Sequence, residues 1–357
     1  MQSGAPRRPR LRAHVWDEVP CGDLLSALHD TVDSNVVHLS VGAGECPADT
    51  EVCVLSPNIF PDNLNAVASL DRLRAIILPY AGLQPKHLDP LRALLGDRLG
   101  KSVALHNVHH NAPMTAEMAI ALMLAAAKSI VPADRRLRAG DWRPRGYPYP
   151  DRVEPPMPMV GLEGRTALIL GLGGVGGRVA KVCAALGMHV VGTRRSGDGA
   201  VEDGVEVHPP SALRALLPRA TGALLVCVPG TRETAGLIGA AELALLPREA
   251  VLVNVSRGEV VDEAALYEAL ASGRIHGAGL DVWWRYPSNY AEACRLPPSA
   301  RPFGDLDSVV MSPHRGGGVG VPGLEVVRMR HVGRMLTAAG SEGVERMPHR
   351  WNFDLGY

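Results

Sequence analysis

The chain lacks a net charge, because 37 lysine and arginine residues are matched by 37 aspartate and glutamate residues. A balanced chain has no overall field that would attract nucleic acid or an anionic membrane. A small anionic substrate remains compatible with this balance, but it needs a local pocket. We therefore expect neither a nucleic-acid partner nor a membrane partner.

Closely spaced cysteines and long apolar runs are also absent. The six cysteines include no close CxxC pair, which predicts reduced thiols and a cytoplasmic location. The longest apolar run, Met118 to Val131, contains Lys128 and is too short to span a bilayer. No apolar stretch of signal-peptide length follows the basic segment 7–12, so we interpret that segment as a frayed tail.

The length of 357 residues is too great for one hydrophobic core and fits two. In residues 12–105, the runs 51–56 and 75–78 predict buried strands, and 88–95 predicts a helix. Residues Thr115–Leu137 predict one long, buried helix with Thr115 as N-cap and Gly140 as its stop. The proline-rich segment 141–159 predicts an irregular connection over the surface.

From Arg165 to His314 the pattern becomes strand, glycine-bearing turn and helix, repeated. The candidate strands are 167–170, 189–192, 223–228, 251–255, 277–280 and 309–311. Short apolar strands that alternate with helices predict a parallel, doubly wound sheet. Residues 321–339 predict a final helix.

A glycine motif lies between the first of these strands and the helix 175–186. Gly171, Gly173 and Gly176 form a GxGxxG pattern around Gly174 and Val175. The first glycine permits a tight turn, the second lets backbone N–H groups approach a pyrophosphate, and the third permits close helix packing. The alternative is a glycine-rich turn without a ligand, but this position favours dinucleotide binding.

The end of the second strand bears on the choice of cofactor. An acidic residue here usually binds the ribose hydroxyls of NAD. This chain instead has Thr193, Arg194, Arg195 and Ser196. Guanidinium groups form bidentate bonds to phosphate, so we expect NADP(H), with NAD(H) as the alternative and solvated arginines as the other interpretation.

Several ordered motifs make the chain resemble the D-isomer-specific 2-hydroxyacid dehydrogenase family over most of residues 75–320. The motifs are Thr115–Ala119, Asp141–Trp142, Gly161–Arg165, Pro229–Thr234, Val253–Gly258, Gly279–Val282 and Ser312–His314.

The resemblance implies an α/β fold of two Rossmann-like, doubly wound parallel-sheet domains. The substrate domain is expected to comprise residues 1–107 plus 316–357, and the NAD(P)-binding domain to be inserted at 108–315. The family is usually a homodimer, and the helix at 115–137 is expected to contribute to its interface.

The resemblance also implies residue roles. Arg257 matches the arginine that binds the substrate carboxylate and carbonyl oxygen, and His314 matches the acid/base group. Tyr80–Leu83 matches a loop whose backbone N–H groups hold the substrate anion, and Lys86 follows it closely. Asp281 matches an aspartate near the nicotinamide. The remaining expected cofactor contacts are Val228, Pro229, Thr234, Val255, Ser256 and His314.

The chain departs from the family pattern at Tyr286, where a glutamate usually pairs with the catalytic histidine. A tyrosine hydroxyl can orient the imidazole but cannot stabilise the imidazolium by charge. We therefore expect a lower pKa for His314 than in glutamate-bearing relatives. Formate dehydrogenases of the superfamily also lack this glutamate, so the departure indicates either a different substrate or, alternatively, lost catalysis.

A second departure is the segment 105–112, which contains His106, His109 and His110. Asn107, Asn111 and Pro113 favour a loop rather than a helix, and no carboxylate or cysteine is nearby, so we expect no metal. We expect one histidine, such as His110, or Asn107 to contact the substrate or the nicotinamide.

Three functions remain open. The first is an NAD(P)-dependent oxidoreductase that transfers a hydride between nicotinamide and a small anionic 2-hydroxy or 2-keto acid. The second is a dehydrogenase of a hydroxyalkylphosphonate or a related small phosphorus acid. The third is a nucleotide-binding regulatory protein like the corepressors that share this fold.

Overall fold

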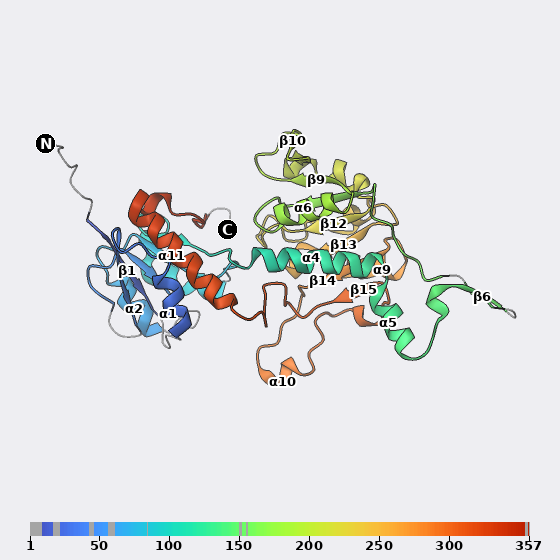
Figure 1. Cartoon of the computed structure of the whole chain (residues 1–357), viewed down its shortest axis with the longest axis horizontal. Coiled ribbons are helices and arrows are strands. Elements are labelled where there is room, and N and C mark those ends of the chain that lie inside the picture. Colours follow the sequence, from blue (N-terminus) through green and yellow to red (C-terminus); the bar gives the residue numbers. More distant parts are fainter. Residues whose placement is uncertain are drawn as a thin grey trace. The chain divides into compact units, whose positions relative to one another are not determined.

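The computed structural model describes residues 9–16, 22–42, 46–55, 61–83, 85–149, 152–154, 156–353 and 356. Residues 7 and 8 of the predicted frayed tail lie outside the described residues, but the prediction is wrong for Leu11 and Arg12, which begin the strand β1 (Leu11–Val15). The chain forms two compact units, residues 1–111 with 321–357 (unit 1) and residues 112–320 (unit 2) (Figure 1). Unit 2 is thus inserted into unit 1, and its limits differ by only a few residues from those expected.

Unit 1 is a five-stranded parallel sheet with the order β2-β1-β3-β4-β5. Its elements are β1 (Leu11–Val15), α1 (Gly22–His29), β2 (Val37–Val41), β3 (Val52–Val54), α2 (Pro61–Ala68), β4 (Ala75–Ile77), α3 (Pro85–Leu95), β5 (Ala104–His106) and α11 (Leu324–Glu342). The strands predicted at 51–56 and 75–78 are confirmed as the shorter β3 and β4.

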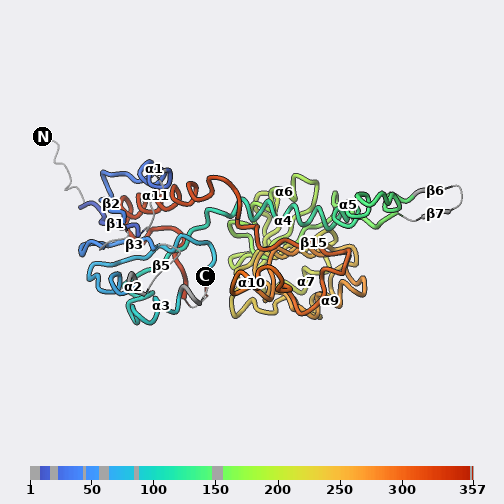
Figure 2. The backbone as a smooth tube through the Cα atoms, turned by 90° about the horizontal axis from the view of Figure 1, so that it is seen from below, coloured from blue at the N-terminus to red at the C-terminus, as the bar shows by residue number. Residues whose placement is uncertain are grey.

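Alternation along the strands of unit 1 supplies two cores. Val52 and Val54 pack with α1 and α11, whereas Cys53 and Leu55 pack with α2 and α3. Because side chains alternate with a period of two, both faces of the sheet are buried and covered by helices. Helices α1 and α11 lie side by side although they are almost 300 residues apart in sequence (Figure 2).

Unit 2 contains an eight-stranded sheet with the order β10-β11-β9-β8-β12-β13-β14-β15, in which only the β10–β11 pair is antiparallel. Its elements are α4 (Ala112–Ala127), α5 (Ile130–Arg138), β6 (Tyr147–Tyr149), β7 (Arg152–Glu154), β8 (Thr166–Leu170), α6 (Gly176–Ala185), β9 (His189–Thr193), β10 (Val201–Glu202), β11 (Val205–His208), α7 (Leu213–Leu216), β12 (Ala223–Val226), α8 (Ala240–Leu243), β13 (Val251–Asn254), α9 (Glu263–Ala271), β14 (Gly277–Leu280), α10 (Tyr290–Ala293) and β15 (Val309–Met311). All six predicted strands are confirmed, and β10 and β11 are additional.

Two apolar layers enclose the sheet of unit 2. Helices α4 and α6 cover one face, where Leu122 and Val179 pack against strand residues such as Ile169. Helices α7, α8 and α9 cover the other face, where Leu266 packs with Leu168. The predicted doubly wound arrangement is therefore present.

The prediction of one helix over 115–137 is wrong. Two helices, α4 and α5, meet at a bend of 64°, and α4 begins at Ala112 rather than at a Thr115 cap. Pro132 has no N–H to continue the helical bonding to Lys128. Ser129 adopts a left-handed φ of 50°, and the Lys128 Nζ donates to the Val160 carbonyl at 2.8 Å.

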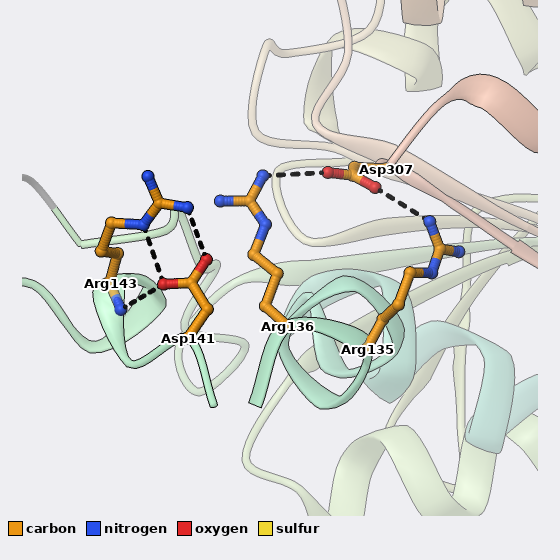
Figure 3. A network of polar contacts seen from close by, with 5 residues as sticks. All are labelled: Arg135, Arg136, Asp141, Arg143 and Asp307. Atoms are coloured by element: carbon orange, nitrogen blue, oxygen red, sulfur yellow. Dashed lines mark hydrogen bonds and ion pairs between the residues drawn. The ribbon is translucent and has the colours of Figure 1, made fainter. Parts of the chain in front are cut away.

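The segment after α5 is more regular than predicted, because β6 and β7 pair as an antiparallel ribbon. Arginine side chains form ion pairs at the end of α5 and at the start of the segment that follows it (Figure 3). Arg135 and Arg136 of α5 converge on Asp307, at 3.5 and 3.3 Å. Arg143 forms a bidentate contact with Asp141 and lowers the pKa of that carboxyl group to about 2.

Within the described residues no single helix is long and apolar enough to cross a membrane. Helices α4 and α5 reach the length and hydropathy of a membrane span only when they are taken together, as a bent pair.

Close packing of α4 on the sheet gives a first prediction. A Cβ added to Gly279 of β14 would lie 2.7 Å from the Leu122 side chain and 3.1 Å from its backbone. We expect Gly279→Ala to lower the free energy of unfolding by about 1–3 kcal/mol, measured by urea denaturation. Gly161→Ala is the matched control, since nothing lies within 4 Å of its added Cβ. Equal stability of the two variants would contradict this packing.

Candidate active site

The glycine turn after β8 has the geometry that a pyrophosphate requires. Gly171 has a φ of 90°, and its N–H donates to Thr193 at the end of β9. A Cβ on Gly176 would lie 2.0 Å from the Gly171 carbonyl oxygen, whereas nothing lies within 4 Å of one on Gly173. The turn is thus tightly packed at Gly176 and leaves open space at Gly173. Helix α6 begins at Gly176, so its N-terminus follows the turn directly. These residues therefore fit a dinucleotide.

The end of β9 carries the side chains expected to select the cofactor. Thr193 is buried, and the Arg194 Nε donates to Ser196 Oγ at 2.9 Å. Arg194 also pairs with Glu202 of β10 at 2.6 Å. The guanidinium is therefore already oriented in the protein, with Ser196 beside it.

The loops after β12 and β13 are joined at the same edge of the sheet. Ser256 Oγ donates to the Val228 carbonyl, and Thr234 Oγ1 donates to the Pro229 carbonyl at 2.6 Å. Val255 and Ser256 are buried. The carboxyl ends of parallel strands are where doubly wound sheets bind ligands, so these residues line the expected edge.

Three predicted side chains of unit 2 come together at this edge. Tyr286 Oη and His314 Nδ1 lie 2.9 Å apart, and the Trp283 N–H donates to Tyr286 Oη at 3.1 Å. Arg257 is near enough for its charge to lower the pKa of both His314 and Tyr286. The predicted hydrogen bond between tyrosine and imidazole is present.

Electrostatics around His314 favour the neutral ring. Burial lowers the pKa of His314 from its ordinary value, Arg257 lowers it further, and Asp281 opposes them. Burial also raises the pKa of Tyr286, so the hydroxyl remains protonated and uncharged. The imidazole thus has a neutral hydrogen-bond partner and a cation nearby.

Comparison with known proteins agrees with this geometry. A family model described as "D-isomer specific 2-hydroxyacid dehydrogenase, NAD binding domain" matches residues 120–316, more than half of the chain. The chain belongs to the D-isomer specific 2-hydroxyacid dehydrogenase family.

Relatives and solved structures extend the match. The chain is 38% identical to a D-3-phosphoglycerate dehydrogenase of Archaeoglobus fulgidus over 57% of this chain and 35% of that protein. It is 40% identical to a glyoxylate reductase of Korarchaeum cryptofilum over 56% of this chain and 55% of that protein. These alignments thus span about a third to about half the length of the relatives. A family member from Xanthobacter autotrophicus Py2, solved with NADPH and MES, superposes with a TM-score of 0.70 at 26% identity, covering 98% of this chain and all of that one.

In this dehydrogenase-family chain, Asp281 is hydrogen-bonded to the loop that carries His314. Its buried carboxylate accepts hydrogen bonds from Ser312 Oγ at 2.6 Å and from the N–H groups of Arg315 and Gly316 at 2.8 Å. Sequence reasoning placed Asp281 near the nicotinamide and missed this role. Ser312 lies 31 residues from Asp281 in the sequence, so no local pattern signals this contact.

Unit 1 contains the other predicted residues. Asn107 Nδ2 donates to the Ala81 carbonyl at 2.8 Å, and the Val108 N–H donates to the Tyr80 carbonyl at 3.0 Å. Asn107 therefore braces the 80–83 loop. The N–H groups of Ala81 and Gly82 have no hydrogen-bond acceptor among the described residues, which suits an anion loop.

The remaining predicted residues of unit 1 have different environments. His106 is fully buried, and its Nδ1 lies 2.8 Å from the Pro348 carbonyl oxygen. His110 is partly buried next to Arg328. The side chain of Lys86 lies outside the described residues. No group of three His, Cys, Asp or Glu residues in the described part of the chain could hold a metal ion.

The neutral partner of His314 gives a second prediction. Replacing Tyr286 by glutamate places a carboxylate beside the ring, which we expect to raise the His314 pKa by about 1 unit or more. Tyr286→Phe removes the hydrogen bond without adding charge and should leave the pKa low. The measurement is the NMR titration of the His314 ring; a pKa unchanged by glutamate would show that the two side chains are not in contact.

Proposed function

We propose that the protein is an NAD(P)-dependent oxidoreductase that interconverts small 2-keto acids and 2-hydroxy acids. The observation that supports it most is the grouping of Arg257, Tyr286 and His314 at the same sheet edge as an open glycine turn. The names of the relatives, glyoxylate reductase and D-3-phosphoglycerate dehydrogenase, favour carboxylate substrates over phosphonates and over a corepressor-like role.

The glycine turn and the loops after β9, β12 and β13 would hold the dinucleotide, whose nicotinamide would supply or accept the hydride. Arg257 binds the carboxylate and polarises the carbonyl oxygen with a permanent charge. In unit 1, the backbone N–H groups of Ala81 and Gly82 are available to an anionic group of the substrate. His314 donates a proton to the carbonyl oxygen during reduction and accepts it back during oxidation.

Tyr286 serves the histidine in both protonation states. Its oxygen accepts the Trp283 N–H, and its own proton is available to a neutral Nδ1. When the ring is protonated, Nδ1–H donates to the same oxygen. We propose that this chain is one of the family members without the usual glutamate, in which the partner of the histidine orients the ring but adds no charge.

The proposal extends to cofactor choice, assembly and location. Arg194 and Ser196 together suit a 2′-phosphate, so we propose a preference for NADP(H), with NAD(H) as the alternative. Ile130, Leu137 and Trp142 are apolar yet largely exposed, with 49–61% of each accessible, and support a homodimer. A cytoplasmic location remains a prediction from the sequence.

The third prediction tests the activity itself. The purified protein should oxidise NADPH when given glyoxylate or hydroxypyruvate, followed by absorbance. Arg257→Gln should lower kcat/KM by about 100-fold or more, because a charged donor to the reacting oxygen is lost. Arg248→Gln, an exposed arginine of the same unit, is the matched control and should keep full activity. Undiminished turnover by Arg257→Gln would refute this assignment.

The fourth prediction concerns the cofactor. Replacing both Arg194 and Ser196 by alanine should raise the KM for NADPH by about tenfold or more, since bonds to a charged phosphate are lost. The KM for NADH should change little. Arg214→Ala removes another exposed arginine of unit 2 and should alter neither value. An equal loss with both cofactors would mean that these residues do not contact the 2′-phosphate.

A further inference from the structure

Arg328 of unit 1, with Tyr80 and His110 beside it, forms a cluster in which the arginine has no role in the proposed chemistry. Arg328 of α11 lies over the ring of Tyr80, with 5.8 Å between its Cζ and the ring centroid. His110, from the loop after β5, is close enough for the Arg328 charge to lower its pKa. The Arg328 side chain is only 15% exposed, so a permanent charge is held close to the protein interior.

Tyr80 and His110, two neighbours of Arg328, are neutral hydrogen-bonding groups. Burial raises the pKa of Tyr80 to about 12, although Arg328 opposes this, so the hydroxyl is protonated at neutral pH. Burial lowers the pKa of His110 to about 4, with further lowering by Arg328 and His331, so this ring is uncharged. One cation flanked by a phenol and an imidazole is a suitable set of groups for an anion.

The position of the cluster also favours a ligand. Tyr80 follows β4 and His110 follows β5, at the carboxyl ends of parallel strands, where doubly wound sheets bind ligands. Tyr80 is itself the first residue of the loop with the available Ala81 and Gly82 N–H groups. A group bound by Arg328 would therefore lie next to the anion loop.

Glu325 is the carboxylate that pairs with Arg328 in this structure. The glutamate is half exposed and lies one helical turn earlier in α11. Solvent at the half-exposed glutamate screens this ion pair, which lowers its contribution to stability. A ligand anion with better geometry can displace it at low cost.

We propose that Arg328, with Tyr80 and His110, binds a second anionic group of the substrate. The preferred substrate is then a short 2-keto or 2-hydroxy acid with a carboxylate or a phosphate at its far end. This inference rests on the proposed function, because it leaves the reacting carboxylate to Arg257.

Matched substrate pairs test the proposal in the wild-type enzyme. 3-Phosphohydroxypyruvate is compared with hydroxypyruvate, and 2-oxoglutarate with 2-oxopentanoate, so that each pair differs at its far end. We expect kcat/KM to be about tenfold or more higher for the member with the second anionic group in at least one pair, as one charge-assisted contact allows. The pair that shows the effect identifies phosphate or carboxylate. No preference in either pair overturns the proposal.

Variants locate the effect. Arg328→Gln should remove most of the preference, chiefly through a higher KM, while kcat/KM for hydroxypyruvate and the KM for NADPH change less than about threefold. Arg328→Lys keeps the charge and should retain part of the preference if the glutamine variant is unstable. Arg330→Gln, an exposed arginine of the same helix, is the control. Equal losses on both members of a pair would show a general structural role and refute the proposal.

A binding measurement separates this inference from the proposed function. Titration calorimetry compares 3-phosphoglycerate with glycerate, and glutarate with butyrate, in the wild type and in the Arg328→Gln and Arg330→Gln variants. Tighter binding of the ligand with two anionic groups that depends on Arg328 supports the second position even if no substrate turns over. Turnover of hydroxypyruvate without any preference for a second anionic group would keep the proposed function and reject the second position.

Discussion

The buried carboxylate of Asp281 is the constraint on which the unit 2 site depends. Asp281 follows β14, and its three hydrogen bonds reach across to the turn that follows β15. That turn forces His314 into a left-handed φ of 56°, a conformation that costs free energy for a residue with a side chain. The backbone bonds to Asp281 stabilise the turn and aim the imidazole at Tyr286. A buried charge is tolerated here because donors surround it.

Much of the fold could be predicted from short-range patterns. Strands β8, β12, β13, β14 and β15 are apolar runs bounded by turn residues, so a buried parallel sheet followed from the sequence, and GxGxxG marked its ligand edge. The break at Ser129 was not predicted, since an alanine-rich run outweighed the single Pro132 in the pattern. Strands β10 and β11 were not predicted because β10 is exposed and β11 is mostly only partly buried, so neither has the apolar run of a buried strand.

The site was predictable only in part, because some of its contacts join residues far apart in the sequence. Arg257 and His314 lie in ordered motifs, and Tyr286 was visible as a departure from one. The carboxylate of Asp281 reaches a turn more than thirty residues away, and no spacing rule gives such a contact. The pairing of Trp351 with Leu105, which adds a C-terminal segment beside β5, is likewise a tertiary contact. Long-range partners are fixed by packing, which the local sequence does not encode separately.

The neutral partner of His314 has a consequence for the direction of the reaction. Reduction needs the imidazolium, and the low pKa means that this form is lost as the pH rises through a value below the ordinary one. Oxidation needs the neutral ring, which is abundant at neutral pH. A carboxylate partner would hold Nδ1–H and leave Nε2 free as a base, whereas the Tyr286 hydroxyl also accommodates the tautomer protonated at Nε2. Only part of the neutral imidazole therefore has Nε2 free as a base, because the hydroxyl also permits the tautomer protonated at Nε2. The low pKa alone would favour oxidation, and this mixture of tautomers makes that preference weaker.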